Sequence, residues 1–403
     1  MKILMVNKFL HPNGGSETYI FNLGDELIRQ GHEVQYFGME HEKRIVGNRL
    51  DVYTDNMDFH TGKLQKLLYP FKIIYSTEAS RKMMQILKAF QPDIVHLNNI
   101  NFQLTPSIIY AVKNYRKQSK RKVKIVATAH DYQWVCPNHM LMIPSSKQLC
   151  FACEGGKYGN CTKNKCIHNS MMKSLLGTVE AKFYHWNGIY KEIDTIICPS
   201  EFLNQKLSTN PAFKGRTITM HNFLTIDQSM DEESRLQLPD RYVVYFGRYA
   251  EEKGIGELLK VIRQLPKIQF VFAGGGPLEA EVNKAENIMN LGFQTGNTLK
   301  KIISNAEFFV FPSQWYENCP FAVMESQMYG TPVVASDLGG TKELVQDKVT
   351  GELYLGEERT ALKEIIERLW NNADTLDNYK ENCKKLPFLD LTQYCNKVLE
   401  IYN

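Results

Sequence analysis

Short apolar runs alternate with helical stretches along most of the chain, and glycines mark many of the junctions. Strand-sized runs of the first half lie at Lys2–Val6, His32–Phe37, Asp93–Leu97, Val123–Thr128 and Thr195–Cys198. A second series lies at Tyr242–Phe246, Gln269–Ala273, Phe308–Phe311 and Pro332–Ala335. Alternation of this kind predicts parallel sheets covered by helices on both faces. The sequence therefore predicts an α/β fold with two doubly wound units in tandem.

The boundaries of these units follow from local composition. In the first unit, Ser16 is a candidate N-cap for a helix that runs to about Gln30, where Gly31 stops it. Residues 222–241 are acidic and poor in apolar periodicity, which is typical of a linker. We expect domains at 1–220 and 221–385. Residues 386–403 are expected to form a helix that returns to the first domain.

Charge is distributed unevenly over the 403 residues. Residues 1–200 carry 26 Lys+Arg and 16 Asp+Glu, a balance of +10, whereas residues 201–403 carry 22 and 28, a balance of −6. No apolar run approaches the roughly 18–20 residues that span a bilayer. The apolar start ends after five residues at Asn7 and Lys8, which favours a buried strand over a signal peptide. We expect a cytoplasmic protein whose halves meet different partners.

Two glycine loops lie between a strand and a helix. Gly14 and Gly15 precede the first helix, and Gly275 lies in the Ala273–Leu278 loop of the second unit. Backbone amides at such a junction can face an anion, although a simple tight turn explains each loop equally well. In the second unit, Arg248 and Lys253 adjoin Gly247 and Gly254, whose lack of a side chain allows a ligand to approach the backbone closely. A guanidinium and an ammonium together suit a diphosphate, whereas either cation alone is more often a solvated surface charge.

The segment from Pro312 to Pro332 carries the densest pattern. Asn318 is a candidate N-cap for a helix whose first turn includes Pro320, with Glu317 in the preceding loop and Glu325 inside the helix. A carboxylate in the loop can accept hydrogen bonds from sugar hydroxyls, and one on the helix can accept two from a ribose diol. A solvated surface role is the alternative for either residue.

Taken together, these motifs resemble the family 4 retaining glycosyltransferases of the GT-B fold, in which two Rossmann-like domains face each other across a cleft. The resemblance spans nearly the whole chain in order. It rests on Gly14–Glu17, Gly247–Arg248, Lys253–Gly254, Gly274–Leu278, Pro312–Ser313, the Glu317 and Glu325 pair, Thr331–Ala335 and Gly339–Gly340.

The resemblance implies a nucleoside-diphosphate sugar as donor, with Arg248 and Lys253 on the diphosphate and Glu325 on the ribose. It assigns Glu317 to the sugar as a positioning group and His130, which closes a predicted strand, to a place near the reacting carbon. The remaining donor-binding residues implied are Gly14, Gly15, Gly247, Gly275, Phe293, Asn318, Cys319, Pro320 and Phe321. No catalytic metal is expected, because the two cations supply the charge that the leaving group needs.

The cysteines are concentrated in an insertion at residues 136–168, which departs from the commonest family pattern. Cys150, Cys153, Cys161 and Cys166 are candidate ligands of a structural zinc ion, with Cys136, His139 and His168 as substitutes. Reduced or oxidised packing cysteines are the alternative.

The basic first half suggests where an acceptor approaches. Residues 113–124 hold seven cations and no acid, and residues 63–90 mix Lys and Arg with apolar side chains. Such segments suit an anionic membrane surface or are merely solvated, and no motif for nucleic acid accompanies them. We expect a hexosyltransferase acting on a saccharide, with a lipid-linked saccharide as the candidate acceptor, in cell-envelope or exopolysaccharide synthesis. A GT-B epimerase, a phosphorylase-like enzyme and a catalytically silent scaffold or partner subunit are the alternatives.

Overall fold

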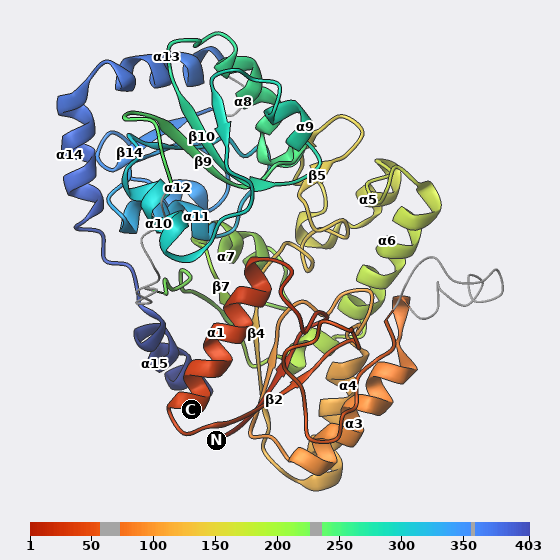
Figure 1. Cartoon of the computed structure of the whole chain (residues 1–403). Coiled ribbons are helices and arrows are strands. Elements are labelled where there is room, and N and C mark those ends of the chain that lie inside the picture. The colour runs from red at the N-terminus through yellow and green to blue at the C-terminus, as the bar shows by residue number, and fades with distance from the viewer. Residues whose placement is uncertain (57–72, 226–235, 356–358) are drawn as a thin grey trace. The chain divides into compact units, whose positions relative to one another are not determined.

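The computed structural model describes residues 1–56, 73–225, 236–355 and 359–403 (Figure 1). The chain divides into two compact units. The first consists of Met1–His221 with Leu391–Asn403, and the second of Asn222–Asp390. Part of the predicted linker, residues 226–235, lies outside the described residues, as does the 63–72 portion of the basic and apolar segment.

A parallel six-stranded sheet forms the centre of the first unit, with strand order β2-β1-β3-β4-β7-β8. The strands are β1 (Lys2–Val6), β2 (Glu33–Phe37), β3 (Ile94–Leu97), β4 (Lys124–Thr128), β7 (Thr195–Cys198) and β8 (Thr217–Thr219). Ile3 pairs with Val34 on one side and with Ile94 on the other. The chain therefore moves outward from β1 in two directions, which is the arrangement of a doubly wound sheet.

The longer helices of the first unit are α1 (Gly15–Arg29), α3 (Thr77–Phe90), α4 (Ser107–Ser119), α6 (Met171–Trp186), α7 (Glu201–Ser208) and α15 (Leu391–Tyr402). Helix α15 packs against α1, where Tyr394 and Tyr19 share a hydrogen bond of 3.0 Å between their hydroxyls. The predicted N-cap at Ser16 is wrong. The cap is Gly14, because the backbone is already helical at Gly15, and Thr18 N donates to Gly14 O at 3.1 Å.

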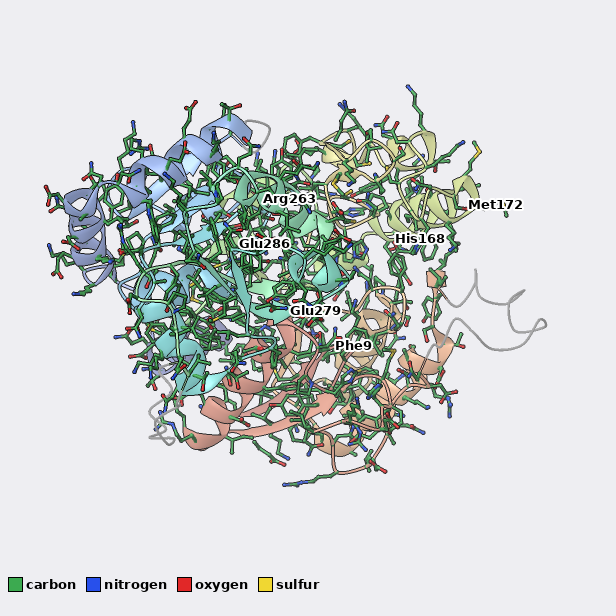
Figure 2. All side chains as sticks on the ribbon, turned by 45° about the horizontal axis from the view of Figure 1, so that its top comes forward. Phe9, His168, Met172, Arg263, Glu279 and Glu286 are labelled. Carbon is green, nitrogen blue, oxygen red and sulfur yellow. The ribbon has the colours of Figure 1, made fainter. Side chains whose placement is uncertain are left out.

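The cysteine-rich insertion leads into α6. It contains a hairpin of β5 (Met142–Ile143) and β6 (Gln148–Leu149), followed by the short helix α5 (Gly159–Lys163), which packs on α6. Near the start of α6, the side chain of Met172 points away from the ribbon (Figure 2). Among the described residues, no helix combines the length and the apolar composition that crossing a bilayer requires.

The second unit repeats the architecture with strand order β11-β10-β9-β12-β13-β14, again all parallel. The strands are β9 (Val243–Arg248), β10 (Phe270–Gly275), β11 (Ile288–Asn290), β12 (Phe309–Phe311), β13 (Val333–Ser336) and β14 (Gly351–Tyr354). The helices are α8 (Ile255–Ile262), α9 (Glu279–Val282), α10 (Gly296–Ser304), α11 (Phe321–Met328), α12 (Thr341–Leu344), α13 (Arg359–Trp370) and α14 (Ala373–Cys383). The predicted α/β fold with two doubly wound parallel sheets is confirmed.

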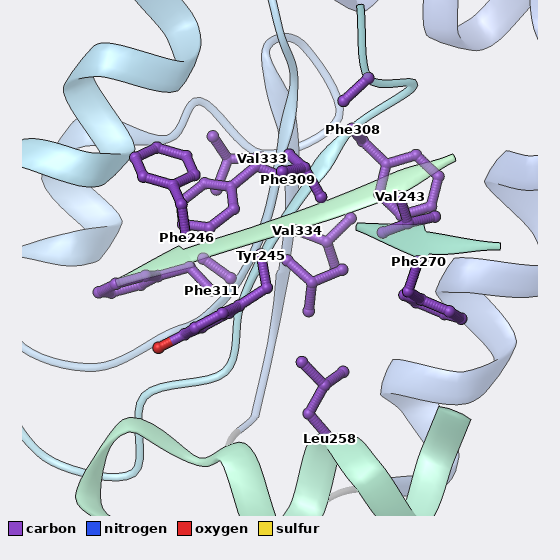
Figure 3. Close-up of a cluster of buried hydrophobic side chains, with 14 of the residues drawn as sticks. Val243, Tyr245, Phe246, Leu258, Phe270, Phe308, Phe309, Phe311, Val333 and Val334 are labelled. Atoms are coloured by element: carbon purple, nitrogen blue, oxygen red, sulfur yellow. The ribbon is translucent and has the colours of Figure 1, made fainter. Parts of the chain in front are cut away.

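Large apolar side chains fill the space around this second sheet. Phe246 and Phe309, on neighbouring strands, have ring centroids 4.4 Å apart with the rings tilted by 31°, and Leu258 of α8 lies on the face where Tyr245 projects (Figure 3). Burial of such residues stabilises the sheet by about 1.5–3 kcal/mol per side chain. The core fixes the strands and hence the positions of the loops at their carboxyl ends.

Candidate active site

Each sheet has a point where the chain reverses its direction of winding, and ligands of open α/β sheets bind outside the strand ends there. In the second unit this point lies between β9 and β12, since β9 leads to β10 on one side and β12 leads to β13 on the other. Arg248 ends β9, and Ser313 follows β12 by two residues. The predicted donor residues Gly247, Arg248, Lys253 and Glu317 therefore come from the end of β9 and from the loops after β9 and β12 at this reversal.

Glu317 is the centre of a hydrogen-bond network at this place. Its Oε1 atom accepts from Lys253 Nζ at 2.6 Å, from Trp315 Nε1 at 2.7 Å and from Ser313 Oγ at 2.9 Å. The residue is 9% exposed, and Lys253 Nζ also lies 5.1 Å from the centroid of the Trp315 ring. The structure thus joins two residues that are 64 positions apart in the sequence and holds both in one orientation.

Close backbone approaches bring these loops together. Gly254 has φ of 76°, and a Cβ atom at this position would lie 1.8 Å from the carbonyl oxygen of Pro312. A Cβ on Gly274 would lie 1.9 Å from the carbonyl oxygen of Gly247. No side chain fits at either place, so the loops after β9, β10 and β12 depend on glycine to pack this tightly.

The other predicted donor residues of this unit lie around the same strand ends without joining the Glu317 network. Arg248 pairs with Glu252, and its side chain is 58% exposed. Gly275 O accepts from Tyr249 N at 2.8 Å, and the ring of Phe293, after β11, is 82% exposed. Burial raises the pKa of Glu325 on α11 above its usual range.

The start of α11 differs from the prediction. Asn318 is not its N-cap: Pro320 occupies that position in extended conformation, and the helix begins at Phe321. In the preceding loop Glu317 forms a bridge with Gly339, and Gly340 N donates to Glu317 O at 2.7 Å, so this part of the chain is tied to the loop after β13. Cys319 is buried, and its carbonyl accepts from Asn222 Nδ2 at 3.1 Å.

In the first unit, the winding reverses between β1 and β3. Gly14 and Gly15 are exposed at the N-terminus of α1. Behind them, Asn7 Nδ2 donates to the buried carboxylate of Glu17 at 2.9 Å, and Asn7 Oδ1 accepts from Asn99 N at 3.0 Å. The polar groups that follow β1 and β3 thus fix the entry into the glycine loop.

His130 lies at the carboxyl end of β4, beside the end of β3. Its Nε2 is 2.9 Å from Asn98 Oδ1, and its ring meets the edge of Tyr19 with centroids 4.9 Å apart. The amide of Asn98 donates to the carbonyls of Val6 and His96, both at 3.4 Å, so Oδ1 is left to accept from His130 Nε2. Burial lowers the pKa of His130 to about 4. His130 is therefore neutral at pH 7.

A hydrogen-bond chain lies under His130 and reaches the C-terminal helix. Tyr19 OH bonds to Thr128 Oγ1 at 3.0 Å and to Tyr394 OH, while His96 bonds to Thr128 through Nε2 at 2.8 Å and to Tyr402 OH through Nδ1 at 2.6 Å. All five residues are buried. Through these bonds α15 is anchored within the first unit.

The cysteines of the insertion are all unpaired thiols. Cys153, Cys161 and Cys166, three of the four predicted zinc ligands, pack in a small buried cluster, and Cys150 is half-buried. A hydrogen bond between Cys161 and Cys166 raises the pKa of the former and lowers the pKa of the latter. Within the described ranges, no group of three or more His, Cys, Asp or Glu side chains is arranged to hold a metal ion.

The basic run at residues 113–124 is partly neutralised. Lys113 and Arg116 both pair with Glu192, and Arg116 also pairs with Asp194 at 2.8 Å. The positive charge of residues 113–124 is therefore less available to an external anion than the sequence suggests.

Some residues of the two networks were not among the predicted site residues. They are Asn7, Glu17, Asn98, Ser313 and Trp315. Most of them follow a parallel strand within a few residues, and a polar side chain directly after a buried apolar run is the signal that identifies this position.

Comparisons with known proteins agree with this geometry. A family model described as Glycosyltransferase Family 4 matches residues 13–228, and one described as Glycosyl transferases group 1 matches residues 227–386. An uncharacterized glycosyltransferase of Methanocaldococcus jannaschii is 33% identical, with 96% of this chain and 93% of the relative covered. O-antigen chain mannosyltransferase C of Escherichia coli is 29% identical over the same shares. The solved structure of Anabaena HepE in complex with UDP and glucose aligns with a TM-score of 0.66 at 17% identity, covering 100% of this chain and 99% of that one.

Proposed function

Since the chain belongs to the Family 4 and group 1 glycosyltransferases and has the GT-B fold, we propose that it transfers a hexosyl group from a nucleoside-diphosphate sugar to a saccharide, with retention of configuration. The observation that carries the proposal is the Lys253–Glu317 pair at the winding reversal of the second sheet. It combines a cation for a phosphate with a fixed carboxylate for sugar hydroxyls.

Lys253 and Arg248 bind the diphosphate in this proposal. Bond cleavage passes through an oxocarbenium-like state and leaves negative charge on the departing phosphate. Cations that are already held in place stabilise that charge without reorganising during the reaction. Glu317 holds Lys253 at 2.6 Å, and Arg248, held by Glu252 and more than half exposed, completes the clamp.

Glu317 positions the sugar in this proposal and does not attack it. Its Oε1 atom already accepts three hydrogen bonds, one of them from an ammonium, which lowers the nucleophilicity of the carboxylate. Attack by the acceptor on the face that the leaving group vacates then accounts for retention. Glu325 accepts from the ribose diol, and the bonds it receives there offset the cost of burying its charge.

The first unit contributes the exposed amides of Gly14 and Gly15 to a phosphate and His130 to the sugar. Because His130 is neutral at pH 7, its role is hydrogen bonding without a positive charge.

A lipid-linked saccharide at the inner face of the cell membrane is the proposed acceptor, in envelope or exopolysaccharide synthesis. Two observations support this: the excess of Lys and Arg in residues 1–200 and the likeness to an O-antigen chain mannosyltransferase. The likeness to HepE with bound UDP makes a uridine donor the first to test.

Thermal unfolding with UDP, GDP, TDP and their sugars tests the donor. A ligand at about 100 times its Kd stabilises the folded protein by about 2.7 kcal/mol, so we expect one nucleotide series to raise Tm. Lys253→Ala should abolish the shift, whereas Lys260→Ala, which removes an exposed lysine paired with Glu257 on α8, should preserve it. If no nucleotide raises Tm, the proposal is wrong. The configuration of the product, read by NMR, tests retention.

A further inference from the structure

Helix α6 exposes the kind of side chain that helices normally bury. Its outward side chains include Met172 (80% exposed), Leu175 (49%), Val179 (44%), Phe183 (38%) and Trp186 (87%). At 3.6 residues per turn, these five positions lie within about 80° of one another around the helix axis. They form one apolar stripe, which we call the α6 stripe, along a helix about 24 Å long.

The inward face of α6 explains why the helix is oriented this way. It consists of the small or polar residues Ser174, Gly177, Thr178 and Ala181 together with Tyr184. Ser174 Oγ accepts from Ile167 N at 2.9 Å, and Thr178 Oγ1 donates to the carbonyl of Tyr158 at 3.0 Å. A rotation that buried the stripe would break these bonds and bring large side chains against the insertion. The packing of the inward face of α6 therefore keeps the stripe exposed.

The surroundings of the stripe are basic. Between positions 157 and 182 the chain has five lysines and a single acidic residue, Glu180. Burial raises the pKa of Glu180 to about 8, so its carboxyl group is largely uncharged at pH 7. Among the described residues, none of these lysines pairs with a carboxylate. They are Lys157, Lys163, Lys165, Lys173 and Lys182.

We propose that the α6 stripe docks on an anionic lipid surface, with its apolar side chains at the boundary between headgroups and acyl chains and the lysines on the phosphates. The proposal deepens the membrane part of the proposed function. An apolar helix face flanked by lysines, with a tryptophan at one end, has the composition of an interfacial helix. A second copy of this chain is a poorer occupant, because a two-fold contact would place the lysines of one stripe against those of the other.

Sedimentation of the full chain with vesicles tests this inference. We expect binding to vesicles of phosphatidylcholine with phosphatidylglycerol, weaker binding to pure phosphatidylcholine, and a decrease with added salt. The double variant Phe183→Gln with Trp186→Gln should bind at least about tenfold more weakly. The matched control is Ile28→Gln with Ile45→Gln, which changes two apolar residues that are 50% and 60% exposed elsewhere in the first unit.

A second readout reports insertion directly. Lipids with brominated acyl chains should quench tryptophan emission of the bound wild-type protein, and Trp186→Phe should remove most of that quenching. Binding of the double variant at the wild-type level would overturn the inference, as would equal binding to neutral and anionic vesicles. Loss of self-association in the variant, without vesicle binding by either protein, would also overturn it in favour of a second copy.

The nucleotide-induced Tm shift separates this inference from the proposed function. It is measured without vesicles, and the double variant changes no proposed donor residue. A normal shift without vesicle binding defeats the docking proposal alone. Vesicle binding without any shift defeats the donor proposal alone.

Discussion

One oxygen atom of Glu317 accepts hydrogen bonds from an ammonium, an indole and a hydroxyl. The ammonium of Lys253 comes from the loop after β9. The indole of Trp315 and the hydroxyl of Ser313 come from the loop after β12, which also carries Glu317. The carboxylate therefore acts as a positioning group for Lys253 whether or not a sugar is bound.

This arrangement predicts different effects for two substitutions. Glu317→Gln keeps an acceptor oxygen but removes the charge that holds Lys253, so we expect kcat to fall by about 100-fold with little change in Tm. Glu317→Ala leaves three donors without their acceptor and should also lower the free energy of unfolding by about 1–3 kcal/mol. Steady-state kinetics and denaturant unfolding measure both effects. Glu257→Gln, in an exposed pair with Lys260, is the control, and an equal loss of activity there would contradict the prediction.

At this scale, the sequence predicted which residue types gather at the strand ends but not their pairing. Arg248, Lys253 and Glu317 were all expected near the donor, yet only the structure shows that Lys253 meets Glu317 and Arg248 meets Glu252. Both acids follow apolar strands, and no local pattern distinguishes the two pairings. Which acid pairs with which cation depends on the close approach of Gly254 to Pro312, which is a tertiary contact.

Among the elements, the short apolar runs gave accurate strand positions. The predicted strands at Lys2–Val6 and Thr195–Cys198 agree with β1 and β7. The predicted caps at Ser16 and Asn318 failed. Just before Asn318, the Glu317 carbonyl accepts a hydrogen bond from Gly340 N, and a partner so distant in sequence is not visible in the local capping pattern.

Helix α15 provides a stability prediction at this scale. Tyr402→Phe would leave the buried Nδ1 of His96 without its partner at 2.6 Å, so the free energy of unfolding should fall by about 1–3 kcal/mol. Lys397→Ala changes an exposed position of the same helix and should have little effect. Denaturant unfolding followed by circular dichroism compares the variants. Equal stability of Tyr402→Phe and wild type would show that the hydrogen bond contributes nothing.

Over the whole molecule, the titrating groups are unevenly shared. All ten histidines lie within residues 1–221, and the second unit has none. Burial lowers the pKa of His96 to about 3 and the pKa of both His130 and His185 to about 4. The two units should therefore respond differently to mild acid.

The direction in which pH changes the stability of the first unit follows from the number of protons that the folded and unfolded states bind. Unfolded histidines titrate near pH 6.5, so between about pH 6.5 and 5 the unfolded first unit binds more protons than the folded one, and its stability falls as the pH falls. Glu180 opposes this because burial raises its pKa to about 8, but three histidines outnumber it. Hydrogen exchange followed by mass spectrometry should show protection decreasing in the first unit and not in the second. Equal responses of both units would contradict the prediction.

The return of α15 to the first unit also has a consequence for synthesis. Residues 391–403 are made after the whole of the second unit, yet Tyr394 and Tyr402 complete the buried hydrogen-bond chain under His130. At about 5–20 residues per second, the ribosome needs on the order of tens of seconds to reach them. The first unit therefore cannot acquire α15 until synthesis has passed through the whole second unit. A premature stop codon anywhere before residue 391 therefore yields a chain whose first unit lacks its final helix.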